Sequence, residues 1–243
     1  MVVTVCVVAT TASARNLRQR HHRARATATR SYTLPPAGSW PRAKVLEAAT
    51  RAFKCGRDAG FFDASIVTII DYSLPSTERR LWVIDLARKK ILFHELVAHG
   101  LNSGDNLAVS FSDREGSRKS SLGLFRTAET YFGKHGVALR LDGLEPGFND
   151  SARERAIVMH GADYVGANAI MKLGHLGRSW GCPAVSRSVS EPLINRIQRG
   201  TALFAYYPDS DWLRSSDFLH CSPTDKVQIA RRFEREGYTQ PIR

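Results

Sequence analysis

The most informative segment of this 243-residue chain reads Arg178-Ser179-Trp180-Gly181-Cys182-Pro183-Ala184-Val185. A cysteine that follows a glycine, at the end of a loop and outside an apolar strand, is a candidate nucleophile. Glycine lets the backbone turn tightly and lets a substrate approach closely. The amide N–H groups of Gly181 and Cys182 can then point at a developing oxyanion. The alternative is a buried structural cysteine, since cysteine is among the most buried residue types.

A second segment, Ala156-Ile157-Val158-Met159-His160-Gly161-Ala162, places a histidine at the exit of an apolar strand. A histidine there emerges at the rim of a sheet and can act as the base for a thiol on a neighbouring loop. A nearby imidazolium can also lower the pKa of a thiol by several units. Taken alone, His160 could equally be a packing or capping residue.

Together, these two segments resemble the L,D-transpeptidase catalytic domain family, whose signature is a His-Gly pair, a gap, and then Ser/Thr-His-Gly-Cys. Two further landmarks follow in the expected order. Residues 120–125 (SSLGLF) look like the family's Thr-Pro-x-Gly-x-Tyr/Phe strand beside the active site, and residues 200–204 (GTALF) look like its Gly-Thr-x-Val closing strand. The resemblance covers roughly residues 65–207. It is strongest to the murein L,D-transpeptidase subgroup with a Ser-Trp-Gly-Cys-Pro motif.

The chain departs from the family pattern at two places. Trp180 stands where most members have a histidine that helps shape the oxyanion hole. Pro183-Ala184 replaces a hydrophobic-Asn/Arg pair. The polar group that braces the cysteine loop, or meets a substrate carboxylate, must therefore come from elsewhere. Arg178 and Arg187 are candidates for it.

The resemblance implies an active site without cofactor or metal. Cys182 is the nucleophile, His160 is the base, and the carbonyl of Gly161 orients the imidazole. The predicted oxyanion donors are the main-chain N–H groups of Gly181, Cys182 and Trp180. A wider set is predicted to bind substrate, each with a structural role as the alternative: Ser179, Arg178, Ser121, Gly123, Tyr131 and His99.

The implied reaction is cysteine-dependent acyl transfer on peptidoglycan stem peptides, through a Cys182 thioester. An amine acceptor would give a 3→3 crosslink or amine exchange, whereas water would make the protein an L,D-carboxypeptidase. Another cell-wall hydrolase and a non-catalytic envelope-binding protein stay as alternatives. A zinc site could draw on several histidines and Cys182, but none has a tight ligand spacing such as H-E-x-x-H. Those histidines are His94, His99, His135, His160 and His175.

Hydrophobic patterning predicts a mostly β (α+β) fold, an L,D-transpeptidase-type twisted β-sandwich core with a few flanking helices. Runs rich in β-branched and aromatic residues predict strands at 66–73, 80–86, 90–98, 106–111, 122–127, 137–141, 156–159 and 202–206. Helical spacing predicts helices from 41 to 56 or 60, at 166–174 and at 188–198. The expected organisation is a signal peptide (1–14), a basic disordered linker (15–40), a helical extension (41–64), the catalytic domain (65–207) and a C-terminal appendage (208–243).

Charge is concentrated at one end of the chain. The net charge is +12, and residues 1–46 hold eight Lys and Arg but no Asp or Glu, which leaves +4 for the rest. No aromatic residues interleave these arginines, so a solvated linker fits better than a nucleic-acid-binding segment. Weak contact of this basic segment with membrane or wall stays open.

Export is expected because the apolar start ends in Ala12-Ser13-Ala14, a small-residue cleavage pattern, although a positive n-region is missing. The predicted location is the periplasm or cell envelope, and the predicted state is a monomer. Cleavage would leave Cys55, Cys182 and Cys221. A Cys55–Cys221 disulfide with a free Cys182 is one arrangement, and three free thiols are the other.

Overall fold

The computed structural model describes residues 39–222, together with Val227 and Arg231. The predicted signal peptide and nearly all of the basic segment lie outside these residues. No helix in the described part of the chain is long and apolar enough to cross a membrane.

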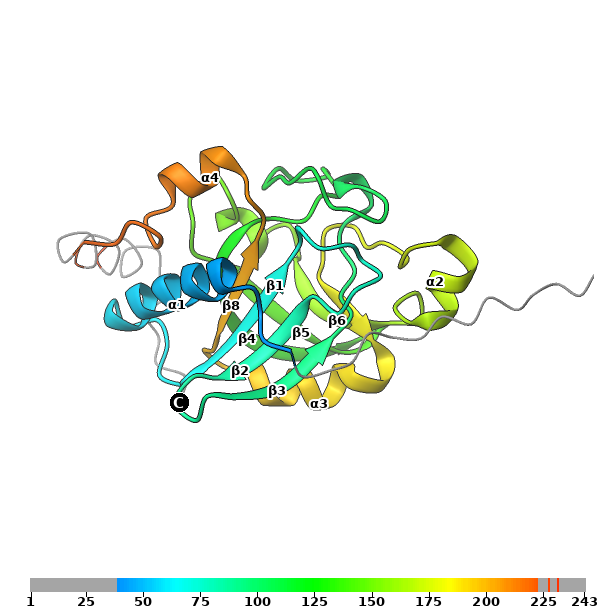
Figure 1. The fold of residues 1–243 in the computed structure, drawn as a ribbon, viewed down its shortest axis with the longest axis horizontal. Coiled ribbons are helices and arrows are strands. Elements are labelled where there is room, and N and C mark those ends of the chain that lie inside the picture. Colours follow the sequence, from blue (N-terminus) through cyan, green and yellow to red (C-terminus); the bar gives the residue numbers. More distant parts are fainter. Residues whose placement is uncertain (1–38, 223–226, 228–230, 232–243) are drawn as a thin grey trace, which may run out of the picture. The chain divides into compact units, whose positions relative to one another are not determined.

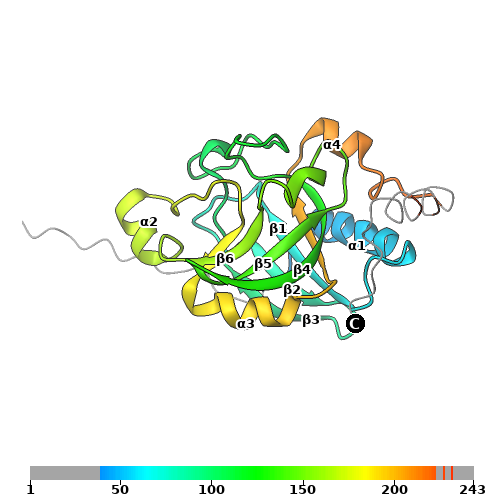
Figure 2. The ribbon, with the colours of Figure 1, turned by 180° about the vertical axis from the view of Figure 1, so that it is seen from behind.

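Eight strands form one hydrogen-bonded sheet in the order β3-β2-β1-β8-β4-β5-β6-β7. Figure 1 shows β1, β2 and β3 crossing in front of β4, β5 and β6, and Figure 2 shows the reverse from behind, so the sheet folds over on itself. The fold is mostly β with a few helices, as predicted. The strands are β1 (Ile66–Asp71), β2 (Leu81–Asp85), β3 (Lys90–Glu95), β4 (Gly123–Gly133), β5 (Gly136–Gly143), β6 (Val158–Ala162), β7 (Ala184–Ser186) and β8 (Ala202–Tyr206).

Most predicted strands are confirmed within a few residues, and one is wrong. Residues 106–111 form a loop, in which Val109 and Ser110 both donate main-chain hydrogen bonds to the carbonyl of Ser103. These local bonds replace a strand ladder, and Val109 remains exposed. The three-residue strand β7 was not predicted, because so short a segment carries no periodic signal.

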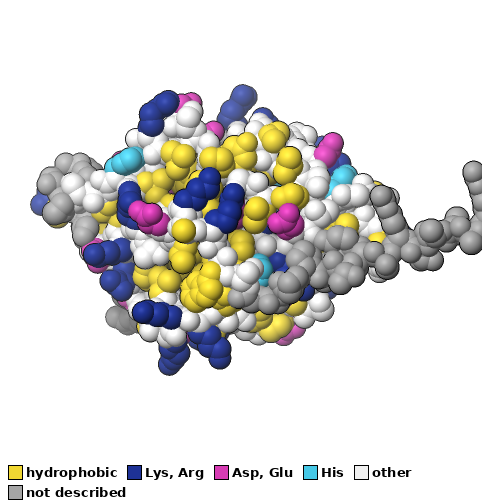
Figure 3. Space-filling view, viewed as in Figure 1, with side chains coloured by type: hydrophobic (Ala, Val, Ile, Leu, Met, Phe, Trp, Pro, Cys, Tyr) yellow, Lys and Arg dark blue, Asp and Glu magenta, His cyan; other side chains and the backbone are white. Residues whose placement is uncertain are grey.

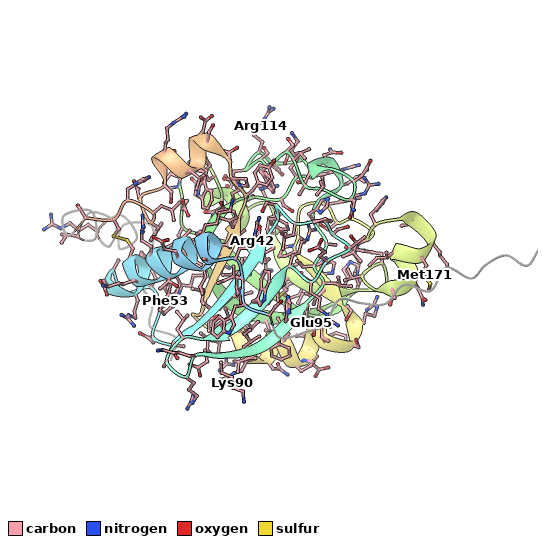
Figure 4. All side chains as sticks on the ribbon, in the orientation of Figure 1. Arg42, Phe53, Lys90, Glu95, Arg114 and Met171 are labelled. Atoms are coloured by element: carbon pink, nitrogen blue, oxygen red, sulfur yellow. A yellow bond between two sulfur atoms is a disulfide. The ribbon has the colours of Figure 1, made fainter. Side chains whose placement is uncertain are left out.

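The N-terminal helix α1 (Ala43–Asp58) covers the sheet at β1 and β8 (Figure 1). Val45, Ala49 and Phe53 recur at helical spacing and are buried in the same core as the strands. Arg42 pairs with Asp71 at the end of β1, with 2.6 Å between Nη2 and Oδ2 (Figure 4). The predicted helix is therefore present and anchored at its first turn.

Three further α-helices within residues 39–222 lie outside the sheet. They are α2 (Ala167–Leu173), α3 (Arg187–Ile197), which packs against β5 and β6, and α4 (Ser210–Ser215) (Figure 2). Trp212 of α4 is fully buried, and its indole donates to the carboxylate of Glu145 at 2.8 Å. The segment that carries α4 is thus packed into the core of the domain through Trp212.

A disulfide joins Cys55 of α1 to Cys221, beyond α4, and Cys182 is a free cysteine. One of the two arrangements that cysteine counting left open is therefore formed. The two half-cystines are 166 residues apart in sequence. Closing a loop of this length restricts the unfolded chain by about 5 kcal/mol in the chain-entropy model.

Charge on the described surface is dispersed. Figure 3 shows Lys and Arg side chains scattered among hydrophobic and uncharged ones on that face, rather than gathered in one stripe. A concentrated basic stripe is the usual electrostatic footprint of nucleic-acid binding. The view therefore offers no surface of that kind on this face.

Candidate active site

Hydrogen bonds from two neighbouring segments hold the loop that carries Cys182. The N–H of Ser179 donates to the carbonyl of His99 at 3.0 Å, and the N–H of Leu101 donates back to Ser179 at 2.8 Å. The hydroxyl of Ser120 donates to the carbonyl of Gly181 at 3.0 Å and accepts the N–H of Gly100. The cysteine is therefore presented on a loop whose main chain is fixed on both sides.

Gly181 is required at its position by its backbone. Its φ is +127°, a conformation that residues with a Cβ rarely adopt. A Cβ there would also lie 2.9 Å from the carbonyl oxygen of Lys119. The tight turn before Cys182 therefore depends on glycine, as the sequence indicated.

The thiol of Cys182 is half-buried and contacts the main chain at the start of β6. Its Sγ accepts the N–H of Val158 at 3.5 Å and donates to the carbonyl of Ala156 at 3.7 Å. Burial raises the pKa of the thiol above its usual 9.0, and the N–H of Val158 and the guanidinium of Arg155 only partly oppose this. A pKa lowered by imidazolium, expected from the sequence, is not found, so the resting group is a neutral thiol.

His160 is buried in β6 and uses one ring nitrogen. Its Nδ1 lies 3.0 Å from the carbonyl oxygen of Gly161. A carbonyl can only accept, so Nδ1 carries the proton and Nε2 keeps its lone pair. Burial is the main cause that lowers the pKa of His160, and the nearby His135, whose ring stacks at 4.7 Å, adds to it. His160 is therefore neutral at pH 7 and has a basic nitrogen.

The thiol and the imidazole both lie at β6 but are not hydrogen-bonded to each other. Among residues 39–222, no hydrogen bond joins Cys182 to His160. The sulfur contacts the main chain of Val158, two residues before the histidine, and His160 donates its own N–H to the carbonyl of Pro183 at 3.4 Å. Catalytic hydrogen bonds are often long in unliganded sites and tighten only when substrate binds.

The predicted oxyanion donors are in different states. The N–H of Gly181 already donates to the hydroxyl of Ser179 at 3.1 Å. The N–H of Cys182 lies against its own sulfur and favours the thiolate. The N–H of Trp180 has no hydrogen-bond partner within the described residues. Of the three predicted donors, the N–H of Trp180 is therefore the one without a partner among the described residues.

Three of the predicted substrate-binding residues have structural roles. Ser179 is buried, and its hydroxyl donates to the carbonyl of Cys182 at 2.6 Å, which closes the cysteine turn. Gly123 has a φ of +104°, and a Cβ there would lie 2.6 Å from the carboxylate of Glu145. Ser121 is buried and accepts from Arg155 at 2.5 Å. These three residues therefore support the local main chain instead of offering a free group to a substrate.

Two more of the predicted set differ in their access to solvent. Arg178 is already ion-paired with Asp105, whose side chain is exposed. Tyr131 is 41% exposed and lies opposite Ala138, which in turn lies opposite His160. Directly paired residues point to the same face of a sheet. Tyr131 therefore shares the face of His160, two strands away.

His99, the last of the predicted set, is 1% exposed. Its Nδ1 accepts from the guanidinium of Arg80 at 2.7 Å, and its Nε2 donates to the carbonyl of Gly104 at 3.1 Å. Burial, followed by the charge of Arg80, lowers the pKa of His99 to about 4. Both ring nitrogens are therefore occupied, and the ring serves the packing of the loop.

A comparison with known protein families identifies the domain. The model of the L,D-transpeptidase catalytic domain family matches residues 39–206, well over half of the chain. The chain belongs to this family. No curated protein sequence matches it significantly.

Several solved L,D-transpeptidases are distantly similar to this family member. One from Mycobacterium smegmatis is 12% identical, with 59% of each chain covered and a TM-score of 0.38. L,D-transpeptidase 3 from Mycobacterium tuberculosis, solved with a faropenem-derived adduct, is 13% identical over 59% of this chain and 60% of that one, at 0.37. One from Stackebrandtia nassauensis is 13% identical over 67% and 65%, at 0.35. This chain spans 59% and 60% of the first two proteins.

Sequence reasoning missed a buried arginine in this L,D-transpeptidase domain. Arg155 donates to the carbonyl of Lys119 at 2.7 Å and to the carbonyl of Ser112 at 2.8 Å, and it lies behind Gly181. It also borders an open hollow of about 780 Å³, which Arg114 and Asp113 line as well. A single arginine carries no periodic signal, so only the folded chain reveals that it braces the loop.

Proposed function

We propose that the protein is a cysteine-dependent L,D-transpeptidase acting on peptidoglycan stem peptides, with Cys182 as nucleophile and His160 as base. The observation that carries this proposal is the free thiol of Cys182, on a braced glycine turn beside a histidine whose Nε2 is unprotonated. Membership of the family supplies the substrate class. No cofactor is part of the proposed reaction. Among the described residues, no three His, Cys, Asp or Glu side chains could hold a metal ion.

Acylation is the first half of the proposed reaction. The sulfur of Cys182 attacks the carbonyl carbon of the third stem residue, a diamino acid, at its L-centre, while His160 Nε2 takes the thiol proton. Because the resting thiol is neutral, proton transfer accompanies attack. The N–H groups of Trp180 and Cys182 stabilise the oxyanion, and losing one such donor typically costs about 3–4 kcal/mol. The C–N bond then breaks, and the imidazolium gives its proton to the departing D-alanine amine.

Deacylation completes the cycle. An acceptor amine loses a proton to His160, attacks the thioester carbonyl and displaces the sulfur of Cys182, which is reprotonated. A diamino-acid amine from a second stem gives a 3→3 crosslink. Water in its place makes the enzyme an L,D-carboxypeptidase. A thioester favours transfer, because amines attack it more readily than water does at comparable concentrations.

The proposed setting follows from the substrate. Peptidoglycan lies in the cell envelope, so the protein must be exported, with residues 1–14 as the proposed signal peptide. We propose that the enzyme works there as a monomer and that its basic N-terminal segment contacts membrane or wall weakly.

Product analysis with a synthetic tetrapeptide and an amine acceptor tests this proposal. The parent enzyme should release D-alanine and form the new amide, and EDTA should leave both products unchanged. Cys182→Ala should form neither, whereas Met171→Ala, at an exposed position on α2, should match the parent. Activity that survives Cys182→Ala and is lost with EDTA would indicate a metal-dependent hydrolase. An inactive parent that still binds the peptide would indicate an envelope-binding protein.

A further inference from the structure

An exposed pair of side chains stands beside the proposed nucleophile. Trp180, two residues before Cys182, is 71% exposed, although tryptophan is usually well covered. The guanidinium of exposed Arg118 lies over its ring, 4.7 Å from the centroid. A cation over an indole face is held by the ring's negative potential. This Arg118–Trp180 pair therefore presents a positioned cation at the cysteine loop.

The main chain beneath Arg118 is fixed to the cysteine loop. The carbonyl of Arg118 accepts the N–H of Asn102 at 3.1 Å, and the next carbonyl, that of Lys119, accepts Arg155 at 2.7 Å. Ser120 then bonds Gly181 directly. The main chain that bears Arg118 is therefore hydrogen-bonded to the loop that bears Cys182.

The backbone of Arg118 is also in an unfavourable conformation. Its φ is +53°, in the left-handed region that residues with a Cβ rarely adopt. Such conformations persist where the surrounding structure imposes them, and they concentrate at functional sites. The hydrogen bonds at Asn102 and Lys119 supply that constraint here.

The other arginines around the site already have carboxylate partners. Arg178 pairs with Asp105, Arg187 pairs with Asp163 at 2.6 Å, and Arg155 pairs with Asp113 at 3.3 Å. Because Arg178 and Arg187 are already paired, they are less available to bind a substrate carboxylate, the role that the sequence suggested for them. Within residues 39–222, Arg118 makes no ion pair and its guanidinium donates no hydrogen bond. Its guanidinium donors are therefore free to meet a ligand beside Trp180.

We propose that Arg118, held by Trp180, binds a carboxylate of the donor stem peptide and so sets the enzyme's preference for anionic donors. The inference rests on the proposed function and names a recognition residue for it. A planar guanidinium donates two parallel hydrogen bonds to a carboxylate, a geometry that lysine does not reproduce. The carboxylate has two possible sources: the C-terminal D-alanine that departs, and the side chain of the diamino acid.

Steady-state kinetics of Arg118→Gln against the parent tests the proposal with three tetrapeptides. One has both carboxylates free, one has an amidated C-terminus, and one has an amidated diamino-acid side chain. With both free, Arg118→Gln should raise KM about 10- to 100-fold, the range of hydrogen bonds to charged groups, with kcat within about twofold. Amidating the bound carboxylate should make parent and variant equal, and that peptide identifies the source. Arg118→Lys should recover part of the loss.

Two matched variants separate recognition from structural damage. Arg114→Gln removes an exposed arginine from the same loop (Figure 4), one that lines the hollow bordered by Arg155, and should leave KM unchanged. Trp180→Leu should raise KM in the same direction as Arg118→Gln, because the guanidinium loses its support. Equal KM values for the parent and Arg118→Gln, or the same rise with all three peptides, would overturn the proposal.

Equilibrium binding separates failure of this inference from failure of the proposed function. Calorimetric titration of Cys182→Ala with the tetrapeptide should give a Kd that weakens about 10- to 100-fold when Arg118→Gln is added. An inactive parent whose Cys182→Ala form still binds peptide through Arg118 would retain the carboxylate site and refute the transferase. Turnover by the parent without any dependence on Arg118 would do the reverse. If the protein neither turns over nor binds the peptide, both fall.

Discussion

Two buried histidines flank the same cysteine loop, and their surroundings differ. His160 lies on β6, and its main-chain N–H donates to the carbonyl of Pro183. His99 lies on the other side of the loop, and its main-chain carbonyl accepts the N–H of Ser179. Burial lowers the pKa of both rings. Both are therefore neutral at pH 7, and protonation state alone does not distinguish them.

The difference lies in the free ring nitrogen. His160 donates Nδ1–H to the carbonyl of Gly161 and keeps Nε2 as an acceptor. His99 donates Nε2–H to the carbonyl of Gly104, and its Nδ1 accepts from Arg80, a buried guanidinium that can only donate. Protonating His99 would break its bond to Arg80 and place two cations together. A histidine beside a cysteine is therefore a candidate base only if one of its ring nitrogens has a free lone pair that can accept the thiol proton.

Replacing His160 should have the largest effect on chemistry. We expect His160→Gln to lower kcat/KM by about 10²- to 10⁴-fold, the usual contribution of a general base. The measurement is the rate of D-alanine release under saturating acceptor. Full activity in this variant would show that His160 is not the base.

Replacing His99 should instead reduce stability. His99→Gln leaves the guanidinium of buried Arg80 without its ring acceptor, a loss of about 1–3 kcal/mol. Urea unfolding should show that loss, while kcat/KM of the folded variant stays within a few-fold of the parent. A drop in activity as large as that of His160→Gln, with stability intact, would show that His99 takes part in the reaction.

The pH dependence of stability should carry the signature of His99. Its pKa is about 4 when folded, below the ordinary 6.5, so the unfolded chain binds a proton first as pH falls. Its contribution to stability is therefore present above pH 6.5 and is lost as pH falls from there to about 4. The melting temperature should decline over that window, and His99→Gln should flatten the decline. An unchanged slope in the variant would place the dependence elsewhere.

Replacing His135 should have the smallest effect. This ring stacks on His160 at 4.7 Å and contributes to lowering its pKa. His135→Gln should therefore raise the pKa of His160 and move the acid limb of the kcat/KM profile to higher pH, by less than about one unit. A limb that moves to lower pH would contradict this assignment of the base.

Patterns confined to neighbouring residues were predictable from the sequence, and contacts made by folding were not. Strand β8 was predicted at 202–206 because a turn at Gly200 bounds an apolar run. The run at 106–111 looks similar, yet its main chain bonds Ser103 locally and forms no strand. The family motif identified Cys182 and His160. Arg118 and Arg155 have no motif, since only tertiary packing brings them to the loop.

Intact-protein mass spectrometry after exposure to a carbapenem tests the central assignment most directly. A carbapenem presents a strained acyl group to an activated nucleophile, in place of the acyl donor of the proposed reaction. The account predicts one covalent adduct on the parent, mapped to the peptide that contains Cys182, and none on Cys182→Ala. An equal adduct on Cys182→Ala, or a folded parent that stays unmodified, would contradict it.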